Sequence, residues 1–410
     1  MLLANKVVYF KFLEVSFRAL AVIFATYTLD AYEAGQFGLI VTLQGFSSFC
    51  FGFERHIDIQ RSYICESTEV FDSAVRSTFL VFFTNYIIFS PLYLLGLNLG
   101  VEIYGYALAV CLVIAVIEQL MNFAYQLALV NQRYVRFLYI ACAKNITFFV
   151  SLVFLWLQQR LNLEAVLIAW AVSAIIFAII MSVSWQLLAR PGKSQVKSIK
   201  DLLIAQYQSS RAHFFIGFIA MLVLQLDRLI VGLVLPLDTV GVYFRHILVV
   251  SLVYQVFNIA SYNRILPDIF RLAKTETIAR AREQVTKEYR NILAFIVLLI
   301  CLAGSLHLIK DGIVFERFNI NPLLMLGLLL ASGVRVRADL NSLVFHALYR
   351  EDVVLKMQFF MLLVSCSLLT SFTLYFGLVG AVLAAGVAAV SYVVLSFVNL
   401  NRFSNSSVKS

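Results

Sequence analysis

The sequence predicts an all-α integral membrane protein with about twelve transmembrane helices, arranged in two six-helix lobes with a central cavity. Three observations predict this class. First, 61% of the 410 residues are hydrophobic and 13% are charged, whereas a soluble domain is about half apolar and a quarter charged. Second, apolar runs recur along the whole chain, and at about 20 residues each can cross roughly 30 Å of hydrocarbon. Third, a polar and basic segment divides the chain near its middle.

The apolar runs are predicted to be helices, because lipid offers no hydrogen-bond partners to open backbone groups. A transmembrane β-barrel would show short segments of alternating polarity, and the sequence has none. The break between the last two runs is placed around Gly377 and Gly380. The predicted spans are residues 7–29, 37–53, 74–96, 102–127, 136–157, 164–188, 212–235, 240–263, 290–309, 321–347, 355–376 and 378–400.

The division into lobes follows the segment "ARPGKSQVKSIKDLLIAQYQSSR", which has six predicted spans on each side. The predicted organisation is an N-terminal lobe over 1–188, a cytoplasmic linker over 189–211, a C-terminal lobe over 212–401 and a cytoplasmic tail over 402–410. Between the eighth and ninth predicted spans, the basic segment 264–289 is predicted to form an amphipathic helix on the inner membrane surface.

The two halves also resemble each other. "LDAYEAGQFGLIV" begins at Leu29 and "LDTVGVYFRHILVV" begins at Leu237, each between the first and second span of its half. "EAVLIAWAV" from Glu164 and "GAVLAAGVA" from Gly380 open the sixth and twelfth spans. A parallel repeat of this kind predicts a binding cavity between lobes that rock between inward-open and outward-open states.

The basic residues predict the orientation of the chain. With the N-terminus inside, 23 of the 32 Lys and Arg residues, Lys144 among them, fall in cytoplasmic segments, and three fall outside. The positive-inside rule therefore predicts that both termini are cytoplasmic. The net charge of +9 follows from this topology, so it gives no reason to expect a nucleic-acid partner.

Ten ionisable residues lie inside predicted spans, where each costs about 2.5–3.5 kcal/mol unless it meets a partner or a wet cavity. Arginine stays protonated and binds phosphate oxygens with a planar fork, so arginines facing the cavity would suit an anionic diphosphate. The substrate-binding candidates are Arg18, Arg228, Arg245, Arg335 and Arg337; Lys11 is the sixth base. The coupling or structural acids are Glu14, Glu118, Asp227 and Asp339.

Several roles stay open at this point. Glu14 with Arg18 and Arg335 with Asp339 are spaced i, i+4, so either pair could be an intrahelical structural contact. Glu118 is either a cation- or proton-coupling acid or a paired packing residue, and Asp227 either has a functional role or locks helices together. Arg337 is turned about 200° from Arg335 around the helix, so the two are not expected to point at one spot.

Several motifs resemble the polysaccharide-type flippases of the multidrug/oligosaccharidyl-lipid/polysaccharide exporter superfamily, which include O-antigen transporters. They are "TLDAYEAGQFGLIVTLQGFSSFCFGFERHIDIQRSY", "QLDRLIVGLVLPLDTVGVY" and "FGLVGAVLAAGVAA", together with Pro267 before a basic segment. The resemblance implies alternating-access transfer of an undecaprenyl-diphosphate-linked oligosaccharide from the inner to the outer leaflet of the bacterial inner membrane. It also implies lipids, a polysaccharide polymerase and chain-length machinery as partners.

Two alternatives remain beside the flippase. A drug/cation antiporter of the same superfamily should carry an excess of acids in its spans, but here bases outnumber acids by six to four. A membrane enzyme that polymerises glycans would favour a long outer loop, and the longest one predicted is 310–320. No cofactor and no metal site are expected, since the cysteines lack metal spacing and no phosphate-binding GxxxxGK[ST] motif occurs.

Overall fold

A computed structural model describes most of the chain, and the helical prediction is confirmed. The described residues are 2–53, 55, 68–130, 135–188, 199–257, 265, 268–269, 272, 278–309, 321–348 and 350–407. Over these residues the backbone is helical apart from short turns, and they contain no strand. The chain divides into two compact units, Met1–Met221 and Leu222–Ser410, each of which is described by itself.

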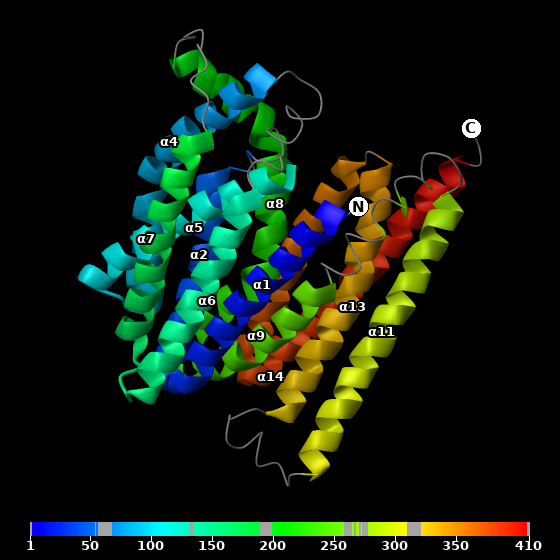
Figure 1. The fold of residues 1–410 in the computed structure, drawn as a ribbon. Helices are drawn as coiled ribbons and strands as arrows, with labels where there is room; N and C mark the ends of the chain where they lie inside the picture. The colour runs from blue at the N-terminus through cyan, green and yellow to red at the C-terminus, as the bar shows by residue number, and fades with distance from the viewer. Residues whose placement is uncertain are drawn as a thin grey trace. The chain divides into compact units, whose positions relative to one another are not determined.

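The first unit is a bundle of long helices (Figure 1). Helix α1 packs on α6, α2 packs on α4 and α5, and α7 contacts both α5 and α6. Aromatic rings stabilise the contact between α1 and α6. The ring of Phe24 on α1 lies edge-on to the rings of Phe149 and Trp156 on α6, with centroids 5.9 Å apart in each pair. The helices are α1 (Leu2–Thr28), α2 (Ala31–Gly52), α4 (Thr68–Val101), α5 (Tyr106–Val130), α6 (Val135–Leu157), α7 (Leu163–Leu188) and the part of α8 (Ile199–Val234) up to Met221.

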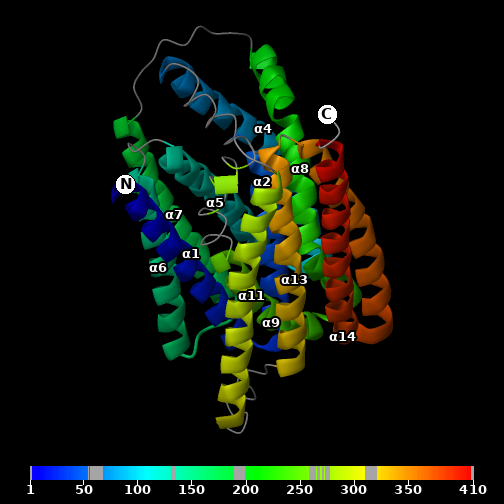
Figure 2. The same ribbon diagram turned by 90° about the vertical axis from the view of Figure 1, so that its right-hand side faces the viewer.

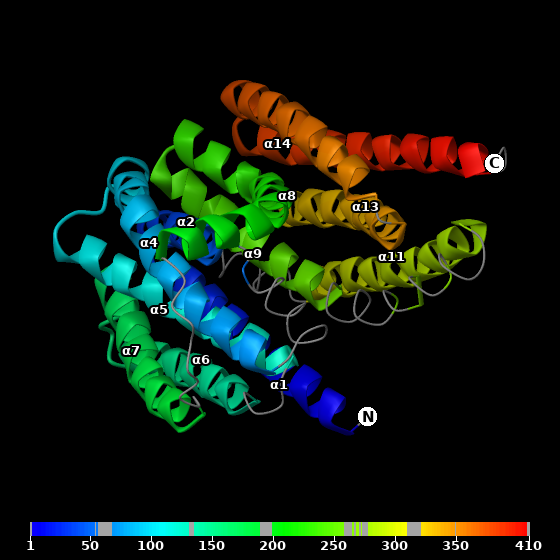
Figure 3. The same cartoon turned by 90° about the horizontal axis from the view of Figure 1, so that it is seen from above.

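The second unit holds the rest of α8 and the helices α9 (Leu237–Phe257), α11 (Ile278–Ile309), α13 (Pro322–Ala347) and α14 (Glu351–Ser407). Helix α13 is central, because α9, α11 and α14 all pack against it. Figures 2 and 3 show that α14, coloured orange to red, doubles back on itself. The turn is at Gly377, whose φ of 59° and ψ of −139° are not helical.

The predicted break around Gly377 is thus confirmed, and α14 contains the last two predicted spans. Next to the turn, Gly380 lies so close to the backbone carbonyl of Phe372 that a side chain would have no room. With α14 counted as two, the described residues form twelve long helices, as predicted.

Seven stretches among the described residues are long and apolar enough to cross a membrane, and the chain is a multi-pass membrane protein. The longest, Asp352–Arg402, spans 51 residues and includes both halves of α14. Helix α13 is not among the seven; it carries Arg335, Arg337 and Asp339.

The repeated motifs mark equivalent helix starts in the two units. Asp30 is the N-cap of α2 and accepts a 2.8 Å hydrogen bond from the backbone N–H of Glu33. Asp238 lies in the first turn of α9, which begins one residue earlier. An acidic side chain at either place satisfies or neutralises the open N–H groups at a helix start. The two Leu-Asp motifs therefore both mark a helix start, Asp30 as the N-cap of α2 and Asp238 in the first turn of α9.

Two predicted boundaries need correction. The separate surface helix over 264–289 is wrong in its second half, because α11 runs without a break from Ile278 to Ile309; most of 264–277 lies outside the described residues. Residues 199–211 of the predicted linker are helical and form the start of α8. In both places a charged amphipathic segment precedes the apolar run within one continuous helix. Polarity alone therefore placed the start of each helix too late in the chain.

Candidate functional site

A buried ion pair lies at the centre of the first unit. The Lys144 ammonium on α6 contacts the Glu118 carboxylate on α5, and the two side chains are 3% and 7% exposed. The indole Nε1 of Trp170 on α7 donates a 2.7 Å hydrogen bond to the same carboxylate. The pair thus joins three helices, and of the two roles open for Glu118 the contacts favour the paired packing residue.

The buried position of Lys144 corrects the count of cytoplasmic basic residues, which placed Lys144 in a cytoplasmic segment. It is the tenth residue of α6, about 14 Å from the helix start at 1.5 Å per residue. Its neighbour Asn145 is buried too, and its side-chain amide donates to the backbone oxygen of Glu14 at 3.2 Å and to its carboxylate at 2.9 Å. A Lys-Asn pair inside the apolar run "YIACAKNITFF" was the signal that could have revealed this cluster.

Arg18 is the candidate base of the first unit. It is one turn beyond Glu14 on α1, and its side chain is exposed, whereas Glu14 is buried. Its charge acts on both Glu118 and Lys144, so it lies at the edge of the buried cluster. The four ionisable groups of this cluster sum to a formal charge of zero.

In the second unit, the adjacent residues Asp227 and Arg228 on α8 find separate partners on α9, as their divergent directions on a helix require. The phenol of Tyr243 donates a 2.6 Å hydrogen bond to Asp227. The guanidinium Nη2 of Arg228 donates a 2.5 Å hydrogen bond to the hydroxyl of Ser251. Arg228 is 8% exposed, and its Nε has no hydrogen-bond partner.

Arg335 and Asp339 on α13 form the predicted i, i+4 pair, but a loose one. The closest approach of the guanidinium to the carboxylate is 3.9 Å, which is too long for a hydrogen bond. Asp339 instead accepts a 2.6 Å hydrogen bond from the phenol of Tyr254 on α9. Arg335 donates from Nη1 to the backbone oxygen of Val223 at 3.3 Å, and its buried Nε has no hydrogen-bond partner.

Arg337 points away from Arg335, as the helical rotation predicts. Its guanidinium lies over the rings of Tyr289 and Phe397, 5.3 and 5.0 Å from their centroids, and donates to the hydroxyl of Thr286 at 3.0 Å. These contacts tie α13 to α11 and to the second half of α14. Its Nη1 is nevertheless buried without a hydrogen-bond partner, so Arg337 stays among the substrate-binding candidates.

Arg245 on α9 is 6% exposed and adjoins His246, which is fully buried. The Nδ1 atom of His246 is 2.7 Å from the carbonyl oxygen of Val242, and its Nε2 is 2.7 Å from the backbone nitrogen of Asn321. Nδ1 therefore carries the proton and Nε2 accepts. His246 thus connects α9 to the N-cap of α13, which fixes the helix that presents Arg335.

The candidate acids and arginines therefore differ in how fully their hydrogen-bonding groups are satisfied. Each of the four candidate acids has a named partner: Glu14 has Asn145, Glu118 has Lys144, Asp227 has Tyr243 and Asp339 has Tyr254. Arg228, Arg335 and Arg337 each retain a buried N–H donor without an acceptor. The tyrosines and Ser251 that hold these charges have no distinctive sequence pattern, so sequence reasoning missed them.

Comparison with known proteins places the fold. No protein-family model and no curated protein matches the sequence. Among solved structures, the lipid II flippase MurJ in an inward closed conformation aligns with a TM-score of 0.69 and 14% identity over 98% of this chain and 88% of that one.

Two multidrug transporters have the same fold. An inward-facing multidrug resistance MATE family transporter of the MOP superfamily has a TM-score of 0.66 and 14% identity, and 96% of each chain is covered. The MATE transporter VcmN of Vibrio cholerae in its bent form has a TM-score of 0.56 and 12% identity, over 99% of each chain. The structural neighbours are thus transporters and a flippase with a two-lobe fold.

Proposed function

We propose that this chain is a flippase that moves an undecaprenyl-diphosphate-linked oligosaccharide, an O-antigen or similar repeat unit, from the inner to the outer leaflet of the bacterial inner membrane. The two lobes alternate between inward-open and outward-open states, and the lipid tail stays in the bilayer. The arginines that supply positive charge to the diphosphate are Arg18, Arg228, Arg245, Arg335 and Arg337. The likeness in fold to a lipid II flippase supports a lipid-linked substrate.

The observation that carries this proposal is the set of unmet guanidinium donors. Nε of Arg228, Nε of Arg335 and Nη1 of Arg337 are buried without a hydrogen-bond partner. An unpaired buried donor is costly, and buried polar groups are normally paired. Diphosphate oxygens are strong acceptors that would satisfy these donors with charge-assisted hydrogen bonds. The site therefore favours a ligand that brings negative charge.

A drug/cation antiporter is the second candidate, because two of the structural neighbours are multidrug transporters. A cation site needs carboxylates that are available to the ligand or to a coupling ion. All four candidate acids already accept hydrogen bonds, and Glu118 is also neutralised by Lys144. This occupancy favours the flippase over the antiporter.

Charge reversal tests the diphosphate role. In cells that lack the native chain, Arg335→Glu and Arg18→Glu should abolish surface display of the glycan, because a carboxylate would repel the diphosphate. Arg160→Glu is the matched control, since Arg160 is exposed in the turn between α6 and α7, and it should retain display. Membrane content is measured by immunoblot. Wild-type display in an inserted Arg335→Glu protein, and in the milder Arg335→Gln, would refute the role.

The orientation is tested separately with a membrane-impermeant thiol reagent in a cysteine-free background. Asp238 and Arg402 are both exposed, one at the start of α9 and the other near the end of α14. Asp238→Cys should be labelled from outside intact cells, and Arg402→Cys should be labelled only after the cells are opened. The reverse pattern would invert the proposed topology.

A further inference from the structure

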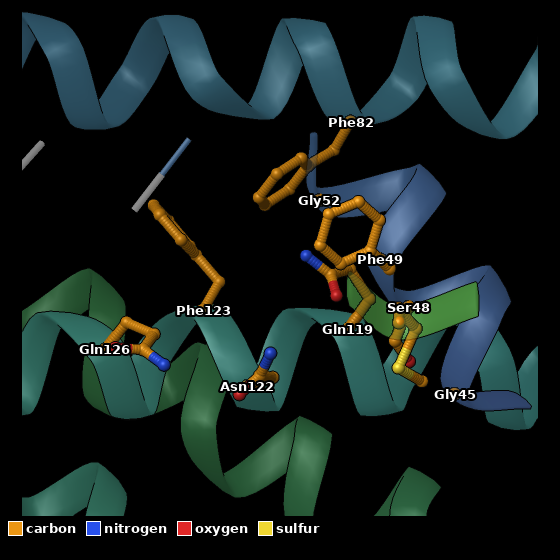
Figure 4. A pocket seen from close by; sticks show the side chains of 10 residues that line it. Gly45, Ser48, Phe49, Gly52, Phe82, Gln119, Asn122, Phe123 and Gln126 are labelled. Atoms are coloured by element: carbon orange, nitrogen blue, oxygen red, sulfur yellow. The ribbon is translucent and has the colours of Figure 1, made fainter. Parts of the chain in front are cut away.

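A cavity of about 150 Å³ lies in the first unit and is lined by residues of α2, α4 and α5 and by Met221 of α8 (Figure 4). None of the ionisable residues considered above lines it. Three amides of α5, on Gln119, Asn122 and Gln126, have i, i+3, i+7 spacing and share one face of that helix. Aromatic rings of Phe49, Phe82 and Phe123 complete the wall.

One amide of this cavity lacks a partner. Gln119 is 4% exposed, and its side-chain oxygen is buried without a hydrogen bond. Figure 4 shows the Gln119 side chain extending from α5 toward Phe49 and Gly52. An unsatisfied buried acceptor in a cavity that also offers polar groups on Ser48 and Asn122 is suited to a ligand with hydroxyl or amide donors.

The lining describes the ligand chemically. It contains no charged side chain, so the favoured ligand is uncharged. Amides both donate and accept hydrogen bonds, as do hydroxyl groups. The electron-rich faces of aromatic rings suit the C–H faces of a sugar ring. A cavity of 150 Å³ is also of the size that can enclose one six-membered ring.

The Gln119 amide lies close to the backbone of α2 at Gly52. A methyl group placed on Gly52 would collide with the amide end of Gln119. Phe82 and Phe123 meet edge-on at 5.0 Å, so the aromatic wall is itself packed. Gln119, Gln126 and Gly52 all lie in the second halves of their helices, which the predicted topology assigns to the cytoplasmic half of the membrane, where loading would occur.

We propose that this cavity binds one uncharged sugar residue of the transported glycan, and that it contributes selectivity for glycosylated over bare polyprenyl diphosphate. The inference rests on the proposed flippase function and deepens it. The arginines bind the diphosphate, which every such lipid carries, whereas the amide and aromatic cavity distinguishes lipids by their sugars.

The test uses the full chain and the polyprenyl-lipid extract of cells that lack it. Purified protein is incubated with the extract, and retained lipids are quantified by mass spectrometry as the ratio of glycosylated to bare polyprenyl diphosphate. Wild type should enrich the glycosylated lipid. Gln119→Leu should lower the ratio roughly tenfold, the effect of one lost hydrogen bond in a buried site, and still retain the bare lipid. Arg335→Gln should lower retention of both.

Two further variants secure the result. Gly52→Ala displaces the Gln119 amide without removing it and should also lower the ratio, so the test stands even where Gln119→Leu fails to fold. Gln358→Leu is the matched control: its side-chain oxygen is likewise buried without a partner, but it lies on α14, outside the cavity, and should keep the wild-type ratio.

The outcomes separate the two proposals. A wild-type ratio in folded Gln119→Leu and Gly52→Ala, or a wild-type protein that retains both lipids equally, overturns the sugar site and leaves the diphosphate function standing. A wild-type protein that retains no polyprenyl diphosphate overturns the flippase function and the sugar site with it.

Discussion

The two units bury charge in different ways. In the first unit opposite charges meet directly, since Lys144 contacts Glu118 and both side chains are almost completely buried. In the second unit neutral hydroxyls hold the charges: Tyr243 and Tyr254 donate to the two aspartates and Ser251 accepts from Arg228. The nearest pair of opposite charges named there, Arg335 and Asp339, approaches only to 3.9 Å.

This difference separates two uses of a charge inside a membrane. A direct buried pair cancels its own field and fixes the packing of three helices, so it suits a rigid element. A charge held by a neutral hydroxyl keeps its field and can still attract a ligand. The second unit is therefore the better candidate for binding and releasing an anion. The first unit is the better candidate for a rigid support that holds the amide cavity.

The largest effect should come from breaking the pair in the first unit. Lys144→Met leaves the Glu118 carboxylate buried without its countercharge, which should lower the free energy of unfolding by about 3–5 kcal/mol. Thermal unfolding of the purified protein in detergent measures the loss. An unchanged melting temperature would contradict the supporting role of this pair.

The double variant Glu118→Leu/Lys144→Met is the control for that experiment. Replacing a whole buried ion pair by apolar residues is often neutral or stabilising, so much of the loss should be recovered. Glycan display should recover with it, because the pair is assigned no contact with the substrate. A double variant that is stable but inactive would instead give Glu118 a coupling role.

A smaller effect is expected in the second unit. Tyr254→Phe removes the hydroxyl that donates to Asp339, and a hydrogen bond to a charged group is worth about 1.5–3 kcal/mol. The loss should stay below that of Lys144→Met, because Asp339 retains Arg335 nearby. Export should fall as well, since the released carboxylate competes with the diphosphate for Arg335. Tyr375→Phe, at an 82% exposed tyrosine, is the control and should change neither value.

Much of the fold could be read from the sequence because lipid restricts it so strongly. Runs of apolar residues must become helices, and the break at Gly377 was visible because glycine tolerates a turn between two such runs. Helix ends were harder to place. Where a polar amphipathic segment extends an apolar run, as at the start of α11, composition changes but the helix does not.

The site was only partly predictable, because the sequence places charges along the spans but does not show which are buried or what they contact; Lys144, assigned to a cytoplasmic segment, is buried, and Arg18 is exposed. Helical spacing gave the Arg335–Asp339 pair and the divergence of Arg337. It could not give Tyr254 or Lys144 as partners of acids 85 and 26 residues away, since those contacts depend on how separate helices pack. The same limit hid the cavity, although the spacing of its amides on α5 was there to be seen.

The two predicted lobes differ, finally, in how their fifth and sixth long helices are joined, and this gives the smallest predicted effect. Residues 158–162 connect α6 to α7, whereas the halves of α14 turn at Gly377 alone. Its positive φ disfavours any side chain, so Gly377→Ala should lower the free energy of unfolding by at least about 1 kcal/mol.

Gly386→Ala is the matched control: it lies in the helix, where a methyl group meets no atom within 4 Å, and should be neutral or stabilise by about 0.5–1 kcal/mol. Equal melting temperatures for the two variants would show that the turn tolerates a side chain.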